Sequence, residues 1–404
     1  MRKTMKIGCL IVSVLGLFIL LDPGGLIGAQ EQVLPRPGLN VQITNVAIPE
    51  NRRPEVTFRI TDERGTPLDR QGVLTEGVVT LRFIIARINP GDRQYTAYTV
   101  RRQTGAVLGT VEQASADTGG TFTDVGPGEY VYRFGTALPE NYDRTVTHTV
   151  GVYADRNLTH VDGNDYVAAA TFDFVPDGRA VTVVRDVVMD ESCNRCHGQL
   201  TAHGVRRSVA VCVLCHTPQT PDPDTGNTTD FNVMIHKIHR GADLPSVQAG
   251  TPYQIIGFRQ SVNDYSTVRL PQDIRHCATC HTGSQGTTYL TRLSRAACGS
   301  CHDNVNFATG ENHLGIRQAD DNNCQICHQP TSDTEFDISV AGSHVIPTQS
   351  RQLPGVNYQI VRVENTNPGQ NLSVIFNVKD DAGNVIQPNQ MSTLAAVFGG
   401  PTTD

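Results

Sequence analysis

A five-residue pattern, Cys-x-x-Cys-His, occurs five times between Cys193 and His328 and constrains the fold of this chain more than any other feature. In this pattern two thiolates form thioethers with the vinyl groups of one haem, and the histidine that follows coordinates the iron. Two intervening residues let a tight turn present both sulfurs along one porphyrin edge. The motif cysteines are Cys193, Cys196, Cys212, Cys215, Cys277, Cys280, Cys298, Cys301, Cys324 and Cys327, and the motif histidines are His197, His216, His281, His302 and His328.

Zinc ribbons are the alternative interpretation of these motifs, because paired Cys-x-x-Cys knuckles also bind zinc. A zinc site needs no histidine after every second cysteine, yet all five copies have one. The motifs use ten of the eleven cysteines and leave only Cys9, so neither a disulfide framework nor a free-thiol enzyme is needed to explain them. The pattern therefore predicts five covalently bound c-type haems.

Length and charge set the broad class of the protein. A chain of 404 residues has room for two or three domains. Its formal charge of −7 provides no large basic patch, and haem propionates would add negative charge, which argues against nucleic acid as a partner. Apolar residues make up 38% of the chain and Trp is absent. The haem stretch is poorer still in continuous apolar runs, so its side chains alone would form a thin core. We expect that stretch not to fold without its porphyrins.

Residues 1–29 have the pattern of an export signal. Basic residues precede an apolar run over 7–21, and small residues follow it up to Ala29. The run is too short for a comfortable membrane span. Cys9 lies early in the apolar run without the leucine of a lipobox before it, so we interpret it as an ordinary signal residue. The expected location is the cell surface and outer membrane, or the periplasm.

Residues 30–184 are expected to form an antiparallel β domain, either a sandwich or a barrel. Alternation such as Val56-Thr-Phe-Arg-Ile60 places one face of a strand in a core, and no helical pattern separates the runs. His148 and His160 are isolated, so we expect them to be structural residues. The expected strands cover residues 41–46, 56–60, 78–86, 95–100, 130–134, 145–153, 166–174 and 181–184.

Residues 185–346 are expected to form a loop-rich pentahaem domain with few short helices. Its clearest helix follows Asp230, a suitable N-cap, and carries His236 and His239. Two histidines three apart share one helix face with their imidazoles offset by nearly a turn. This spacing suits two ligands that reach two neighbouring haems, although a structural histidine pair is the alternative.

The alternating pattern returns after residue 346 and repeats the start of the β domain. Gly38-Leu-Asn-Val-Gln-Ile43 corresponds to Gly355-Val-Asn-Tyr-Gln-Ile360, and residues 56–65 correspond to 374–383. Residues 347–404 are therefore expected to be an incomplete second β domain. A partial sandwich cannot bury its sheet face, so we expect the protein to continue beyond Asp404 or this segment to pair with another chain.

The motifs in this order resemble those of the OmcA/MtrC family, the outer-membrane decahaem c-type cytochromes of metal-reducing bacteria. The similarity includes Cys193-x-x-Cys-His-Gly-x-Leu-x-x-His-Gly, the Ile-His-Lys-Ile-His-Arg-Gly segment before residue 242, Pro271-Gln-Asp and the stretch from Ala297 to His313. The resemblance implies alternating β and pentahaem domains that pass electrons to extracellular acceptors such as metal oxides or electron shuttles. It also implies other cytochromes as partners and, in the outer membrane, a porin–cytochrome conduit.

Each of the five irons needs a sixth ligand in addition to its motif histidine. Among the other histidines of this stretch and its end, six are near enough in sequence, one more than needed. The resemblance implies a set of five without His276, because the family usually has Asn beside that cysteine. From the residues alone His276 competes with His344, which follows a flexible Ala-Gly-Ser approach. The implied distal ligands are His203, His236, His239, His313 and His344.

Three functions are compatible with this ligand count. Irons with two histidine ligands are saturated, so they exchange electrons without binding substrate, which favours an electron conduit. A multihaem oxidoreductase would need one iron with an open position. A conductive filament subunit is the third alternative. We expect an electron-transfer protein, or at most a terminal metal reductase without a dedicated substrate pocket.

Overall fold

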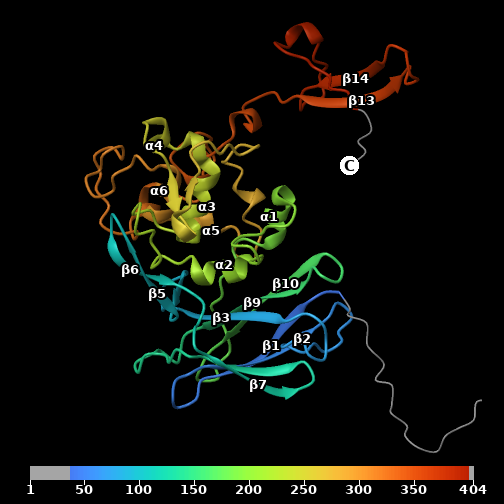
Figure 1. The fold of residues 1–404 in the computed structure, drawn as a ribbon. Coiled ribbons are helices and arrows are strands. Elements are labelled where there is room, and N and C mark those ends of the chain that lie inside the picture. Colours follow the sequence, from blue (N-terminus) through green and yellow to red (C-terminus); the bar gives the residue numbers. More distant parts are fainter. Residues whose placement is uncertain (1–36, 400–404) are drawn as a thin grey trace, which may run out of the picture. The chain divides into compact units, whose positions relative to one another are not determined.

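The computed structural model describes residues 37–399, and the expected export signal, including Cys9, lies outside them. Two four-stranded antiparallel sheets face one another at the N-terminal end of this range (Figure 1). The first has the order β1 (Asn40–Ala47), β2 (Glu55–Thr61), β8 (Glu129–Arg133) and β7 (Thr121–Gly126). The second has the order β10 (Asn164–Phe174), β9 (His148–Leu158), β3 (Val79–Ile88) and β4 (Tyr95–Ala97).

The core between the sheets is aromatic and aliphatic. In β2 the alternation Val56, Phe58, Ile60 is fully buried, as its period of two predicts. Phe83 of β3 stacks on Tyr132 of β8 with 4.4 Å between ring centroids, which ties the two sheets together. The prediction of a β sandwich is therefore confirmed. The barrel alternative is wrong, because the two sheets do not join within residues 37–399.

Several expected strands differ in the structure. The expected strand over 95–100 is two strands, β4 and β5 (Val100–Gly105), which belong to different sheets. The expected strand over 181–184 is wrong, because this segment leaves the sandwich without a pairing partner. Within residues 30–184 two strands were not anticipated, because apolar and polar residues do not alternate in them: β6 (Gly109–Ala114), which pairs with β5, and β7.

Short helices dominate the stretch that carries the Cys-x-x-Cys-His motifs, as expected when ligand spacing governs the backbone. One small hairpin, β11 (Gln254–Ile256) with β12 (Val262–Asp264), lies among them. The α-helices are α1 (Asp190–His197), α2 (Val209–Cys215), α3 (Phe231–Arg240), α4 (Pro245–Gln248), α5 (Thr288–Thr291), α6 (Arg295–Cys301), α7 (Cys324–Cys327) and α8 (Val340–Ser343). The 3₁₀ turns are η1 (Gly241–Asp243), η2 (Phe258–Gln260), η3 (Cys277–Thr279), η4 (Pro347–Gln349) and η5 (Pro388–Gln390).

Helix α2 attaches the second motif to the β sandwich. Its Leu214 is fully buried and packs with Ile84 and Ala86 of β3. Gly151 of β9 makes room for this contact, since a Cβ at residue 151 would collide with the Leu214 side chain. The motif cysteines of α2 are thus placed by the packing of a β-sheet face.

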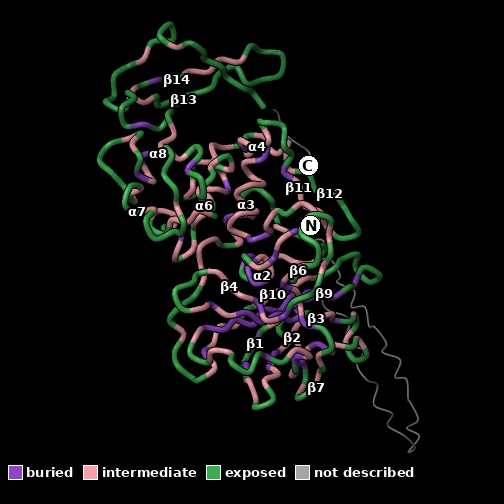
Figure 2. The backbone as a smooth tube through the Cα atoms, turned by 90° about the vertical axis from the view of Figure 1, so that its left-hand side faces the viewer, coloured by how far each residue is buried: buried purple, intermediate pink, exposed green. Residues whose placement is uncertain are grey.

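The C-terminal hairpin, β13 (Asn357–Glu364) with β14 (Ser373–Lys379), has the same register as β1 with β2. Ile43 pairs with Phe58 and Ile360 pairs with Phe376, and a one-residue bulge follows each isoleucine. Burial differs sharply, because Ile43 is 6% exposed and Ile360 is 67% exposed. Figure 2 shows the buried residues concentrated in the sandwich and the β13–β14 hairpin largely exposed.

Candidate haem-binding site

One cavity of about 3410 Å³ runs through the region of the motifs. All ten motif cysteines and all five motif histidines line it, and so do the six further histidines considered as sixth ligands. An ordinary small-molecule pocket has a volume of about 300–1,000 Å³, so this cavity is large enough for several cofactors. Its lining of paired thiols and imidazoles fits c-type haem. No disulfide joins any of the motif cysteines, whose thiols are all free.

A helical turn arranges the three reactive side chains of each motif. In four motifs the backbone N–H of the histidine donates to the carbonyl of the first cysteine, at 2.8–3.0 Å. This hydrogen bond closes one turn, so that the two sulfurs and the imidazole leave the backbone on the same side. The four bonds are His216 to Cys212, His281 to Cys277, His302 to Cys298 and His328 to Cys324.

Each motif histidine faces a second histidine across the cavity at nearly the same distance. A metal between the two rings of a pair would form one metal–nitrogen bond of about 2 Å to each imidazole. These two bonds, together with the distance from each nitrogen to the centre of its own ring, would account for a centroid spacing of this size. His276 lines the cavity but belongs to none of these pairs. The pairs, in motif order, are His197 with His239 (6.0 Å), His216 with His203 (6.0 Å), His281 with His236 (6.1 Å), His302 with His344 (6.2 Å) and His328 with His313 (6.2 Å).

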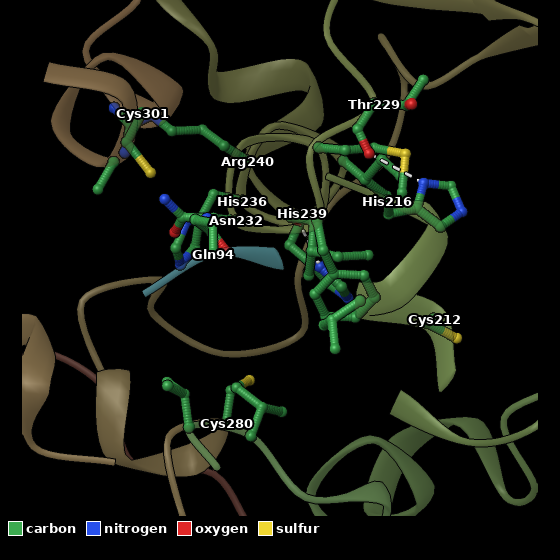
Figure 3. A pocket seen from close by; sticks show the side chains of 18 of the residues that line it. Gln94, Cys212, His216, Thr229, Asn232, His236, His239, Arg240, Cys280 and Cys301 are labelled. Atoms are coloured by element: carbon green, nitrogen blue, oxygen red, sulfur yellow. Dashed lines mark hydrogen bonds between the residues drawn. The ribbon is translucent and has the colours of Figure 1, made fainter. Parts of the chain in front are cut away.

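Backbone carbonyls orient many of these imidazoles. A carbonyl oxygen only accepts, so an imidazole Nδ1 beside it carries the proton and leaves Nε2 free as a ligand. Figure 3 shows this bond between His216 and Thr229. The Nδ1 atoms that donate in this way belong to His216 (Thr229, 2.9 Å), His239 (Ile235, 2.8 Å), His313 (Ile316, 2.8 Å), His328 (Ile338, 2.9 Å) and His344 (Val340, 2.8 Å).

Burial favours the uncharged form of several side chains of the site. It lowers the pKa of His216 and that of His236 to about 4, so both imidazoles are neutral and able to coordinate a metal at neutral pH. Burial also raises the pKa of Cys212 to about 12 and that of Cys215 to about 11. The residues present therefore fit a covalently attached haem, with thiols for the thioethers and neutral imidazoles for the iron.

Helix α3 serves two of the pairs at once. Asp230 caps its N-terminus by accepting from the Asn232 N–H at 3.2 Å, as the sequence predicts. One helical turn then points His236 at His281 of the third motif and His239 at His197 of the first. Figure 3 shows both α3 histidines beside the cavity, with Cys280 of the third motif across it.

The motifs follow one another in space in an order that differs from their order in the sequence. Burial raises the pKa of four motif thiols, and a thiol of another motif raises each of them further. Such charge effects fall with distance, so these motifs are neighbours. The interacting thiols are Cys212 with Cys193, Cys193 with Cys280, Cys277 with Cys301, and Cys298 with Cys324, which gives the order second, first, third, fourth, fifth.

Several arginines line the same cavity, and sequence reasoning singled out none of them; Arg206 and Arg240 are two of these. Each follows a distal histidine closely, Arg206 three residues after His203 and Arg240 directly after His239. An arginine this close in sequence to a distal histidine is a signal that could have identified both residues, because haem carries two carboxylates that a cation can bind. His148 and His160 behave as expected, because His148 bonds to Tyr98 at 2.8 Å inside the sandwich and His160 pairs with Glu76 at the surface.

Five covalent attachment motifs around one cavity, each with an opposed second imidazole, define a multihaem c-type cytochrome. Residues 185–340 match the family described as outer membrane cytochrome MtrC/MtrF-like, domains II/IV. The multihaem cytochrome MtrC of Shewanella baltica (strain OS185) is 29% identical over 317 residues, which cover 72% of this chain and 41% of that protein. Residues 185–340 thus resemble a domain of these outer-membrane cytochromes, and the chain is similar to the multihaem cytochromes of the OmcA/MtrC family.

Two solved structures share the fold. The outer membrane decahaem cytochrome OmcA superposes with a TM-score of 0.63 at 23% identity, covering 87% of this chain and 54% of OmcA. MtrC from Shewanella baltica OS185 superposes with a TM-score of 0.56 at 25% identity, covering 86% of this chain and 51% of MtrC. The chain thus spans about half the length of these relatives. Within residues 37–399, no helix is long and apolar enough to cross a membrane.

Proposed function

We propose that this chain binds five c-type haems, each with two histidine ligands, and conducts electrons through them. The five imidazole pairs carry the proposal, since each spacing of 6.0–6.2 Å suits one iron between two rings. The bound iron supplies a reversible change between its ferric and ferrous states. The motif cysteines tether the five groups, the motif histidines are the proximal ligands, and His203, His236, His239, His313 and His344 are the distal ligands.

Saturated irons favour conduction over substrate chemistry. Every motif histidine has an opposed imidazole, so the proposed ligand set leaves no axial position for a substrate. One continuous cavity is lined by all five motifs, which supports electron transfer between neighbouring proposed sites. Helix α3 carries the proposed distal ligands of the first and third sites three residues apart, which supports the proposal that these two sites are neighbours.

The wider role that we propose rests on the similarity to the OmcA/MtrC family. We propose that the protein is exported by residues 1–29 and acts at the outer membrane or cell surface. Its electrons would arrive from other cytochromes, including a porin–cytochrome conduit, and leave to extracellular metal oxides or electron shuttles. We also propose that residues 347–404 begin a second β domain, because β13–β14 repeats the register and bulge of β1–β2.

Haem counting and spin-state spectroscopy test the central proposal. The protein would be produced in a host with haem-attachment machinery and examined by intact mass, haem absorbance and electron paramagnetic resonance (EPR). We expect five haems per chain, all low-spin and none binding carbon monoxide. A haem that is high-spin and binds carbon monoxide would favour the oxidoreductase alternative, and fewer than five haems would remove the corresponding site.

A further inference from the structure

Arg206 has a guanidinium that the protein itself leaves incompletely paired. Its Nε is buried and has no hydrogen-bond partner. No ion pair within residues 37–399 includes Arg206. A buried charged donor without a partner is unfavourable, because it loses its hydrogen bonds to water and gains none from the protein. The residue also lines the haem cavity, so a partner from the cofactor can reach it.

Arg206 and the distal histidine His203 belong to one tight turn. The backbone N–H of Ala202 donates to the Arg206 carbonyl at 2.9 Å, and the Arg206 N–H donates back to the Ala202 carbonyl at 3.0 Å. His203 and Gly204 take left-handed conformations between them, with φ of 50° and 83°. The turn therefore holds the imidazole and the guanidinium in a fixed relation to one another.

The turn of Arg206 carries one imidazole of the second pair. His203 stacks on His216 with 6.0 Å between ring centroids and 15° between ring planes. Arg206, His203, His216 and the two cysteines of the second motif line the same cavity. A group bound between these two imidazoles would therefore lie within one short turn of Arg206.

Tyr153 of β9 contacts the same guanidinium. The Arg206 Cζ lies 4.6 Å from the centroid of the Tyr153 ring, and Nη2 donates to the Tyr153 hydroxyl at 3.0 Å. These two contacts hold the guanidinium in place and leave Nε as a further donor. A carboxylate suits such a group, because an arginine can present two N–H groups to it.

We propose that Arg206 binds a propionate carboxylate of the haem at the second site, with Tyr153 as the residue that positions it. This inference rests on the proposed function, because it needs a haem between His203 and His216. Arg206 then neutralises a negative charge next to the iron and fastens that haem to the β sandwich through Tyr153. A positive charge near an iron stabilises the reduced form, so Arg206 raises the potential of this one haem.

Redox titration of the haem-loaded protein tests the proposal, with absorbance and EPR resolving the haems. In Arg206→Gln we expect one of five midpoint potentials to shift to a lower value. Arg206→Lys should shift the same haem by less, because lysine keeps the charge and lacks the fork. Tyr153→Leu should shift it in the same direction. Arg102→Gln is the matched control, since Arg102 is exposed on β5 outside the cavity lining, and it should change none.

The outcomes separate this inference from the proposed function. Five low-spin haems with unchanged potentials in Arg206→Gln would overturn the role of Arg206 and leave the conduit intact. A missing haem in the unaltered protein would overturn the second site itself. If Arg206→Gln fails to take up haem, the test uses Arg206→Lys instead. A lowered potential of the second haem in Arg206→Lys, together with an altered propionate band in its resonance Raman spectrum, would support the proposal. Arg206→Lys with the wild-type potential and band would overturn it.

Discussion

The imidazole rings of His302 and His344 face one another with 6.2 Å between their centroids and 67° between their planes. The two residues are 42 positions apart in the sequence. Helix α8 places His344, since Ser339 caps the helix and the Val340 carbonyl accepts from His344 Nδ1 at 2.8 Å. His276 was its competitor as the fifth distal ligand, and it faces no motif histidine.

This arrangement makes His344→Ala a direct test of the fourth site. Removing the imidazole opens one iron, so one haem of five should become high-spin and bind carbon monoxide, as measured by EPR and absorbance. His276→Asn is the matched control and should leave all five low-spin. The reverse result would transfer the ligand role to His276.

The angle between paired imidazole planes predicts two kinds of EPR signal. The third and second pairs are nearly parallel, at 8° and 15°, whereas the fourth and first pairs are steeply inclined, at 67° and 74°. Parallel planes split two d orbitals of low-spin ferric iron, and perpendicular planes leave them almost degenerate. The oxidised protein should show ordinary rhombic signals together with signals of very large maximum g value.

Two variants assign these signals. His344→Ala should remove a large-g signal, and His236→Ala should remove a rhombic one, because His236 belongs to the 8° pair. A spectrum with rhombic signals alone would contradict the inclined geometry of the fourth and first pairs.

Gly151 should be intolerant of even a methyl group. In Gly151→Ala the new Cβ meets the Leu214 side chain, so we expect overpacking to destabilise the protein by about 1–3 kcal/mol. Thermal unfolding measures the loss, and the spectrum of the second site should change as α2 shifts. Gly126→Ala is the control, because a Cβ there makes only ordinary contacts with Glu129. Equal stability of the two variants would show that α2 is not tightly packed on β9.

The two hairpins offer a matched pair of substitutions at the same register position. Ile43→Ala should destabilise the protein by about 2–5 kcal/mol, because Ile43 lies in the sandwich core. Ile360→Ala should change stability by no more than about 0.5 kcal/mol in the 404-residue chain, because Ile360 is 67% exposed. Urea unfolding followed by far-ultraviolet circular dichroism compares them. A similar loss for both would mean that the β13–β14 face is covered in solution.

Arg275 should stabilise the protein in a pH-dependent way. Its guanidinium forms a two-bond fork with Asp273, at 2.6 and 2.9 Å, and lowers the pKa of that carboxyl from 3.8 to about 2. A lowered pKa contributes stability that is present above 3.8 and lost as the pH falls through about 2. Arg275→Gln should therefore lower the melting temperature at pH 7, with a difference from wild type that shrinks toward pH 2. A difference independent of pH would assign the effect to the bond between Arg275 and the Val345 carbonyl.

Much of this protein could be read from local pattern. The two-residue gap in Cys193-Asn-Arg-Cys-His fixes the cofactor chemistry, because covalent attachment depends on a single helical turn. The alternation of Val56, Phe58 and Ile60 identified a core face, and Asp230 marked the start of α3, since both signals act over a few residues. Where pairing partners mattered, local pattern was insufficient, as the expected strand over 181–184 shows.

Only the tertiary structure could decide which imidazoles meet and in which order the sites follow. His216 meets His203, which precedes it by 13 residues, while His302 meets His344 from 42 residues beyond. No rule of sequence spacing predicts both separations, because each depends on how the loops between the two histidines return to the cavity. The stacking of Arg206 on Tyr153 is of the same kind, since it joins a turn of the haem region to a strand of the sandwich. The sequence specified the chemical groups, and long-range packing specified their partners.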